Sequence, residues 1–163
     1  MTGSDRAEPS QICVGDLYNA TGYSMTAVGL IHSEGRVLLA LSAHDRRWGL
    51  LGGPVRRMET PADALRRSIV ARTGVCVRVE ALQGVVHNPC ACCIELVFEA
   101  RLVQGCEVRL DREELLRAAW FRMNALPANI SESARSAVEA FMDQRATPFL
   151  VTHRGGEGGA WHA

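Results

Sequence analysis

The stretch GGPVRRMETPADALRRSIVARTGV contains a helix whose two ends are both marked by specific residues. Thr60 is a favourable N-cap, and Pro61 suits the first helical position, where its missing N–H has no intrahelical partner to lose. Gly74 readily takes the left-handed conformation that ends a helix. The sequence therefore predicts a helix over residues 61–73, preceded by a tight diglycine loop.

The segments around this helix predict a sheet. Two apolar runs, residues 24–32 and 36–43, are separated by Ser33–Glu34–Gly35, a hairpin pattern in which Gly35 can take a positive φ. Further β-prone runs cover residues 75–87, 93–103 and 117–123, and a second helical pattern covers residues 131–145. Ser131 is a plausible N-cap of this second helix, and its expected buried stripe consists of Ala134, Val138, Phe141 and Met142. Strand pairs before and after the first helix predict a sheet-rich α+β domain.

The run at residues 93–103 has two different faces. Every second residue from Ile94 to Leu102 is apolar and is expected to point inward, since side chains alternate along a strand. Glu95 and Glu99 lie on the opposite face, which we expect to be solvated. The same two carboxylates are also the candidates for replacement metal ligands.

Length and charge limit the classes of protein that this chain can belong to. With 163 residues and 47% hydrophobic content, it suits one domain, for which we expect an N-terminal segment 1–21, a core 22–148 and a flexible Gly-rich tail 149–163. Eighteen basic and eighteen acidic side chains cancel, so no overall positive field favours nucleic acid or a membrane surface. No apolar run approaches the roughly 18 residues of a membrane span, and we expect a cytoplasmic protein.

Six cysteines in a chain without a secretory signal are expected to be reduced thiols. Cys13, Cys76 and Cys106 are predicted to be small buried apolar residues. Four further side chains cluster in the sequence HNPCACC: His87, Cys90, Cys92 and Cys93. A zinc site usually takes Cys/His pairs from two separate places, so a turn followed by a strand is the better interpretation, and a reactive thiol is left open.

Residues in and around the first helix resemble the signature of the Nudix superfamily: a glycine, five residues, a glutamate, seven residues, then Arg-Glu-aliphatic-any-Glu-Glu-any-Gly-aliphatic. The matching residues are Gly53, Glu59, Arg67, Ile69, Gly74 and Val75. Landmarks outside this signature are Trp48, Glu113, Trp120–Phe121 and Leu126–Pro127, so the resemblance covers about residues 22–145. It implies the Nudix fold, an α/β/α sandwich around a mixed β-sheet.

The resemblance also implies that active members hold a divalent metal, which positions water for attack on a diphosphate. The family's metal ligands are glutamates, and the corresponding residues here are Ser68, Ala71 and Arg72, so the chain has a degenerate Nudix box. Glu59 is the only carboxylate that remains of the box. Mg²⁺ is usually held through carboxylates, and a guanidinium about 4 Å from a dication repels it by about 4 kcal/mol per unit charge at an effective dielectric near 20. We therefore expect standard metal-dependent hydrolysis to be impaired or lost.

We expect arginines of this loop and helix to hold an anion instead, because a guanidinium binds phosphate oxygens in a bidentate fork. The predicted ligand-binding residues are Arg57, Arg67, Arg72 and Glu95, and the predicted catalytic residues are Glu59 and His87. Glu59 and Arg67 form either a family-like pair, in which the arginine orients the glutamate, or an ordinary surface ion pair. No metal ligands and no cofactor are predicted, with Mg²⁺ or Mn²⁺ required only if hydrolase activity is retained.

Whether the protein is an enzyme is left open by these residues. The first hypothesis is a protein that binds a nucleotide-like or other phosphate-bearing small molecule. The second is an active Nudix hydrolase of a nucleoside diphosphate-linked substrate with relocated metal ligands. The third is a scaffold repurposed for a different reaction, in which His87 acts with the nearby cysteines. The expected partner is an anionic small molecule rather than nucleic acid or a membrane, and a homodimer is the expected assembly if one forms.

Overall fold

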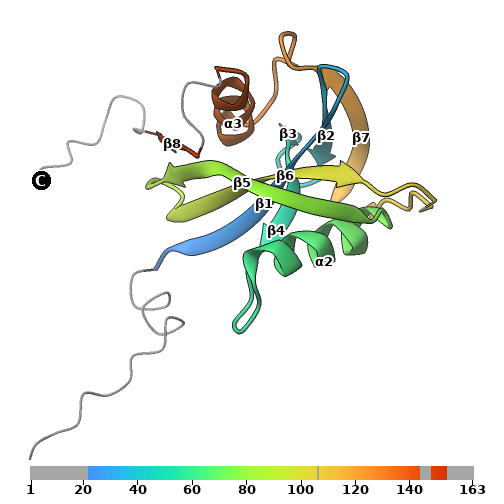
Figure 1. Ribbon diagram of the computed structural model, residues 1–163, viewed down its shortest axis with the longest axis horizontal. Coiled ribbons are helices and arrows are strands. Elements are labelled where there is room, and N and C mark those ends of the chain that lie inside the picture. The colour runs from blue at the N-terminus through green and yellow to red at the C-terminus, as the bar shows by residue number, and fades with distance from the viewer. Residues whose placement is uncertain (1–21, 106, 144–147, 154–163) are drawn as a thin grey trace, which may run out of the picture.

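The computed structural model describes residues 22–105, 107–143 and 148–153 (Figure 1). The strands are β1 (Ser24–Ser33), β2 (Arg36–Ser42), β3 (Trp48–Gly49), β4 (Leu51–Pro54), β5 (Val77–Asn88), β6 (Cys93–Leu102), β7 (Leu115–Arg122) and β8 (Phe149–Thr152). The helices are α2 (Pro61–Thr73) and α3 (Glu132–Asp143). No helix in the described part of the chain is both long and apolar enough to span a membrane.

Strand β1 is the centre of the sheet. It runs parallel to β6, antiparallel to β4 along its first half and antiparallel to β2 at its end. The main strand order is β3-β2-β1-β6-β5-β8, with β7 paired to β2. Figure 1 shows α2 on one side of this mixed sheet and α3 on the other. The α/β/α sandwich implied by the resemblance is therefore confirmed.

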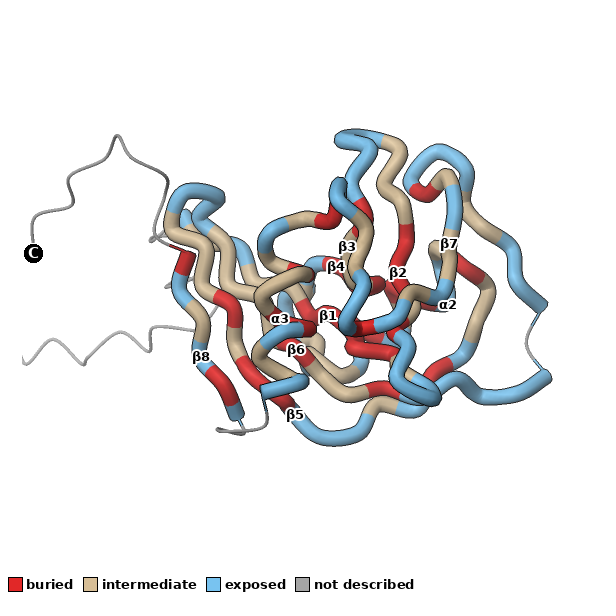
Figure 2. The backbone as a smooth tube through the Cα atoms, turned by 90° about the horizontal axis from the view of Figure 1, so that it is seen from above, coloured by how far each residue is buried: buried red, intermediate tan, exposed pale blue. Residues whose placement is uncertain are grey.

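The core has two parts, one on each face of the sheet. Leu65 and Ile69 of α2 are fully buried against one face, together with Ala27 and Ala100. Val138 of α3 is fully buried against the other face, in a cluster of strand side chains that includes Val28, Leu30, Leu39, Val86 and Val97. Figure 2 shows the buried segments along the centre of the molecule and the exposed segments at the loops. Both helices are therefore held mainly by apolar burial.

The predicted helix boundaries at residues 61–73 are confirmed. The hydroxyl oxygen of Thr60 accepts a hydrogen bond from the backbone N–H of Asp63 at 3.2 Å. Gly74 has φ 68°, and its N–H donates to the carbonyl of Val70. These contacts satisfy backbone groups that a helix end would otherwise leave without partners.

The predicted hairpin between β1 and β2 is confirmed as well. Its two-residue turn has positive φ at both positions, 49° at Glu34 and 71° at Gly35. This is the backbone pattern of a type I′ turn, whose twist matches that of the flanking strands. The sequence indicated the positive φ of Gly35 but not that of Glu34.

The prediction of a solvated outer face on β6 is wrong. Val97 lies between Glu95 and Glu99 on that face and is fully buried in the α3 side of the core. Glu95 and Glu99 themselves are only partly exposed. The alternation along β6 was correct, but α3 covers the second face, which a strand pattern alone does not reveal.

Two predictions near the C-terminus need correction. Phe149–Thr152 is not part of a flexible tail, because it forms strand β8, pairs in parallel with β5 and buries Phe149. Residues 154–163 of that predicted tail lie outside the described residues. In α3, Ser131 accepts from the N–H of Ala134 as predicted, but Met142 of the expected buried stripe is 46% exposed.

The diglycine at the end of β4 allows the backbone of β4 to approach its neighbours very closely. A Cβ atom on Gly52 would overlap the carbonyl oxygen of Ala27 and lie 2.7 Å from the Cα of Val28. A Cβ on Gly53 would overlap the side chain of Ser68 on α2. Only glycine fits between the central strand and the helix at these positions.

We predict that Gly52→Ala lowers the free energy of unfolding by about 2 kcal/mol, because the new methyl group meets backbone atoms that cannot move aside. Gly49→Ala is the matched control, since its Cβ would only make an ordinary 3.7 Å contact with the Ser131 hydroxyl. Urea titration of both variants measures the difference. If the two variants have equal free energies of unfolding, the backbone of Gly52 does not approach β1 as closely as described.

Candidate functional site

Glu59 and Arg67 form a two-pronged ion pair between the loop after β4 and helix α2. Arg67 donates from Nε to one carboxylate oxygen at 2.6 Å and from a terminal nitrogen to the other at 2.9 Å. That terminal nitrogen also donates to the carbonyl of Pro54 at 2.9 Å. The second carboxylate oxygen accepts from the backbone N–H of Arg56 at 3.0 Å. The pair therefore holds the loop in shape and is more than a surface contact between two side chains.

This geometry determines the protonation state of Glu59. The pKa of Glu59 is lowered from 4.5 to about 2, mainly by the hydrogen bonds from Arg67; burial opposes this shift, and the Arg56 N–H contributes to it. The carboxylate is therefore ionised at neutral pH. It is an acceptor and not a proton donor under those conditions.

Arg72, in the last turn of α2, makes a similar contact with strand β4, which leads into the loop. It donates to the carbonyl of Gly52 at 2.7 Å and forms an ion pair with Glu114. Glu114 lies in the turn before β7 and is exposed. Its pairing with Arg72 was not predicted, because residues 42 positions apart in the chain meet only after folding.

Ser68 and Ala71, which the sequence resemblance aligned with metal-ligand positions, do not offer a set of metal ligands. Ser68 is 4% exposed, and its hydroxyl has no hydrogen-bond partner among the described residues. Ala71 is exposed and has no ligand atom in its side chain. Among residues 22–105, 107–143 and 148–153, no three His, Cys, Asp or Glu side chains are grouped so that they could hold a metal ion. A single hydroxyl, a methyl group and a guanidinium do not form the hard oxygen ligand set of Mg²⁺.

Glu95 lies near this loop but on the α3 face of the sheet. In the strand register, Pro54, Thr26 and Glu95 form one row across β4, β1 and β6, which places Glu95 about 10 Å from Pro54. Burial raises the pKa of Glu95, and a hydrogen bond with Ser133 partly offsets this shift. Glu95 therefore lies at the end of the sheet where β4 leads into the loop, and within the described residues no hydrogen bond or ion pair joins it to Arg57, Arg67 or Arg72.

His87 is paired with a residue that the sequence did not single out. Its Nε2 lies 3.2 Å from the hydroxyl of Tyr23, and the two ring centroids are 5.5 Å apart. Tyr23 lies just before β1. In β5, His87 follows Val86, and Val86 pairs with Glu95 of β6. His87 thus lies at the same end of the sheet as the loop, with tyrosine as its hydrogen-bond partner.

The cysteines after His87 differ from one another in exposure. Cys90 and Cys92 are exposed, and Cys93 is partly buried with its sulfur 3.7 Å from the hydroxyl of Thr26. The prediction of a turn and then a strand is confirmed by β6, which begins at Cys93. Cys76 is exposed and not buried as predicted, while Cys13 and Cys106 lie outside the described residues.

We predict that Ser68→Ala raises the free energy of unfolding by about 1 kcal/mol, because it removes a buried hydroxyl without a partner and adds a better helix former. Thr73→Val is the matched change. It should lower stability by about 1 kcal/mol, since the Thr73 hydroxyl donates to the carbonyl of Ile69 at 2.7 Å. Thermal unfolding of both variants tests whether Ser68→Ala stabilises the protein and Thr73→Val destabilises it. If Ser68→Ala destabilises the protein, the Ser68 hydroxyl is not an unsatisfied polar group.

We predict that the Glu59–Arg67 pair contributes to stability in a defined pH range. Because folding lowers the pKa of Glu59 from 4.5 to about 2, the contribution is complete above about pH 4.5 and is lost as the pH falls towards 2. The stability difference between the wild type and Glu59→Gln should therefore shrink over that range. Denaturant titrations at pH 7, 4.5 and 3 measure it, with Glu113→Gln, which removes an exposed carboxylate, as control.

Comparisons with known proteins agree with this fold. The NUDIX domain family model matches residues 21–141. A "MutT-like protein" of Streptomyces ambofaciens is 31% identical over 111 residues, which is 68% of this chain and 71% of that protein.

Two solved structures show the same similarity. The MutT NUDIX hydrolase from Burkholderia pseudomallei is 27% identical, with a TM-score of 0.65 over 72% of this chain and 96% of that one. An ADP-ribose pyrophosphatase from Streptococcus suis shares the fold at 17% identity, with a TM-score of 0.62 over 80% of this chain and 98% of that one. The family model covers most of the described core, from before β1 into α3, and the protein is thus a member of the Nudix family.

Proposed function

We propose that this Nudix protein binds a nucleotide-like or other phosphate-bearing small molecule, and that its standard metal-dependent diphosphate hydrolysis is impaired or lost. The observation that carries the proposal is the position of Arg72. Its guanidinium stands at a family metal-ligand position and is held between the Gly52 carbonyl and the Glu114 carboxylate.

This arrangement disfavours a divalent ion for two reasons. The Gly52 and Glu114 oxygens, which are hard ligands of the kind that Mg²⁺ prefers, already serve a permanent cation. A dication about 4 Å from Arg72 would also be repelled by about 4 kcal/mol per unit charge at an effective dielectric near 20. Glu59, the remaining carboxylate of the box, is likewise engaged by Arg67.

The arginines of the site have different parts in the proposed binding. Arg67 and Arg72 each bind a carboxylate and a backbone carbonyl of β4. We therefore assign them a structural role, which is to hold the loop and its flanking strand in place. Arg57 is exposed, and its side chain has no ion-pair partner among the described residues. The exposed Arg56 is its neighbour. We therefore propose that Arg56 and Arg57 make the first contacts with phosphate, through charge-assisted hydrogen bonds.

Glu95 has a separate part in this proposal. It lies in the same strand row as Pro54, and its buried carboxyl is suited to hydrogen bonding with a polar group attached to the phosphate. His87 and Tyr23 border the same end of the sheet. We propose no chemical step for His87, because its hydrogen bond goes to a tyrosine and not to a thiol. A cytoplasmic location and a homodimer remain part of the proposal on sequence grounds alone.

We predict that ADP-ribose and ATP bind the protein in the presence of EDTA, with little change on adding Mg²⁺. The double variant Arg56→Gln/Arg57→Gln should weaken binding about tenfold or more, since a charged hydrogen bond is worth about 1.5–3 kcal/mol. Isothermal titration measures both effects. Arg117→Gln is the control, because it removes an exposed arginine from β7.

The same samples distinguish the alternative of an active hydrolase with relocated ligands. Release of AMP or phosphate is followed with Mg²⁺ or Mn²⁺ present. Rapid, metal-dependent turnover that is unaffected by Arg72→Gln would overturn the proposal, and so would binding that requires the metal. If such turnover is found, its rate in the variant Glu59→Gln shows whether the Glu59 carboxylate takes part in hydrolysis.

A further inference from the structure

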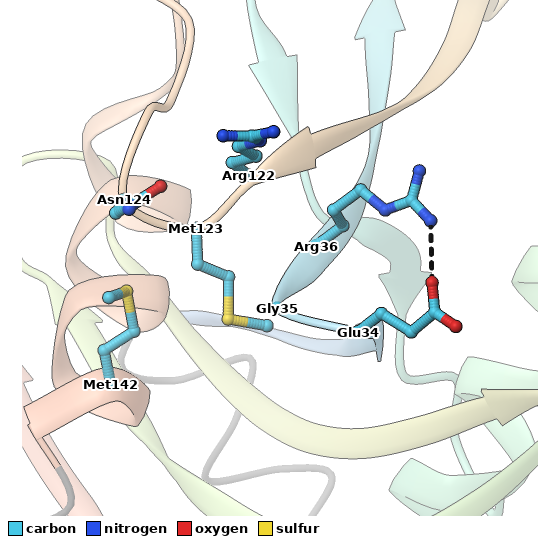
Figure 3. Close-up of a pocket in the computed structure, with 7 residues that line it drawn as sticks. All are labelled: Glu34, Gly35, Arg36, Arg122, Met123, Asn124 and Met142. Carbon is cyan, nitrogen blue, oxygen red and sulfur yellow. Dashed lines mark hydrogen bonds and ion pairs between the residues drawn. The ribbon is translucent and has the colours of Figure 1, made fainter.

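A separate groove lies where the β1–β2 turn, the end of β7 and helix α3 meet (Figure 3). Its volume is about 550 Å³, and it is lined by Glu34, Gly35, Arg36, Arg122, Met123, Asn124 and Met142. This volume falls within the range of about 300–1,000 Å³ that is typical of small-molecule sites. None of the lining residues belongs to the loop after β4 or to α2.

Two arginines lie side by side at the edge of this groove, on two paired strands. Arg36 of β2 and Arg122 of β7 are direct partners in the antiparallel register. Like charges placed directly opposite each other destabilise a pair of strands. Arg36 pairs with Glu34, but that pair is exposed and screened by solvent, and Arg122 has no carboxylate partner within the described part of the chain. The edge therefore carries uncompensated positive charge.

The opposite wall of the groove is apolar. Met123 is buried in the α3 side of the core, and its N–H donates to the carbonyl of Gly35 at 3.0 Å, which fixes the end of β7 to the turn. Met142 of α3 is 46% exposed, although its helical spacing predicts a core position. In Figure 3 the Met123 side chain extends towards the turn at Gly35, and the Met142 side chain lies along α3 on the other side of the groove. Two flexible thioethers form an adaptable apolar surface.

We propose that this groove binds a small amphipathic anion, whose phosphate or carboxylate group lies between Arg36 and Arg122 and whose apolar part lies on Met123 and Met142. The anion supplies the negative charge that the opposed arginines lack, and its apolar part covers the exposed side of Met142. This site is independent of the function proposed for the loop and helix α2. The side-chain amide of Asn124 provides a further polar contact at its rim.

Methionine methyl groups report on ligand binding both in this groove and at the loop after β4, so one experiment follows both sites. With ¹³C-methyl methionine, NMR titration is carried out with hexyl phosphate, hexanoate, inorganic phosphate and 1-hexanol. We expect saturable shifts of the Met123 and Met142 methyls with at least one of the two hexyl anions. The methyl of Met58, which is 98% exposed in the loop after β4, should stay unchanged when this groove is filled. The two hexyl anions distinguish a phosphate-binding site from a carboxylate-binding site.

Arg122→Gln should weaken binding of the preferred hexyl anion about tenfold or more, while Arg117→Gln on the same strand should leave it unchanged. Arg122→Gln should also raise the melting temperature of the ligand-free protein, because it relieves the repulsion from Arg36. Absence of shifts at Met123 and Met142, equal binding of 1-hexanol, equal binding of inorganic phosphate, or full binding by Arg122→Gln would each overturn the proposal. Folding of each variant is checked by the unperturbed Met25 methyl.

Discussion

The close approach of the Gly52–Gly53 backbone to strand β1 and helix α2 is the constraint on which the rest of the structure depends. A side chain at either glycine would overlap the central strand or Ser68. With glycine there, β4 pairs with β1, α2 packs on the sheet through Leu65 and Ile69, and the carbonyl groups of the loop face the helix. The position of every arginine on α2 follows from this contact.

Two arginines on α2 use those carbonyl groups. Arg67 donates to Pro54 and Arg72 to Gly52, and each also pairs with a carboxylate, Glu59 or Glu114. Cations thus stabilise the shape of the loop from within the protein. The geometry of this loop and helix therefore depends on glycine, helix caps, apolar burial and these arginine contacts.

Most of the fold was predictable because its signals are local. The helix caps at Thr60 and Gly74, the β1–β2 turn and the alternation along β6 depend on residues within a few positions of one another. The errors arose where a distant segment covers a surface. Helix α3 buries the Glu95 face of β6, and β5 provides the partner that turns residues 149–152 into a strand. Patterns within a segment do not reveal what packs on it.

The sequence by itself determined the Nudix fold and the side chains that its loop and helix carry, because glycine, cap and apolar spacing act through short-range sterics and burial. Tertiary structure alone decided what those side chains do. It paired Arg72 with Glu114, left the Ser68 hydroxyl without a hydrogen-bond partner among the described residues and placed Arg36 opposite Arg122. Charge pairing and hydrogen-bond satisfaction depend on ångström-scale distances between residues far apart in the chain, and only folding sets those distances.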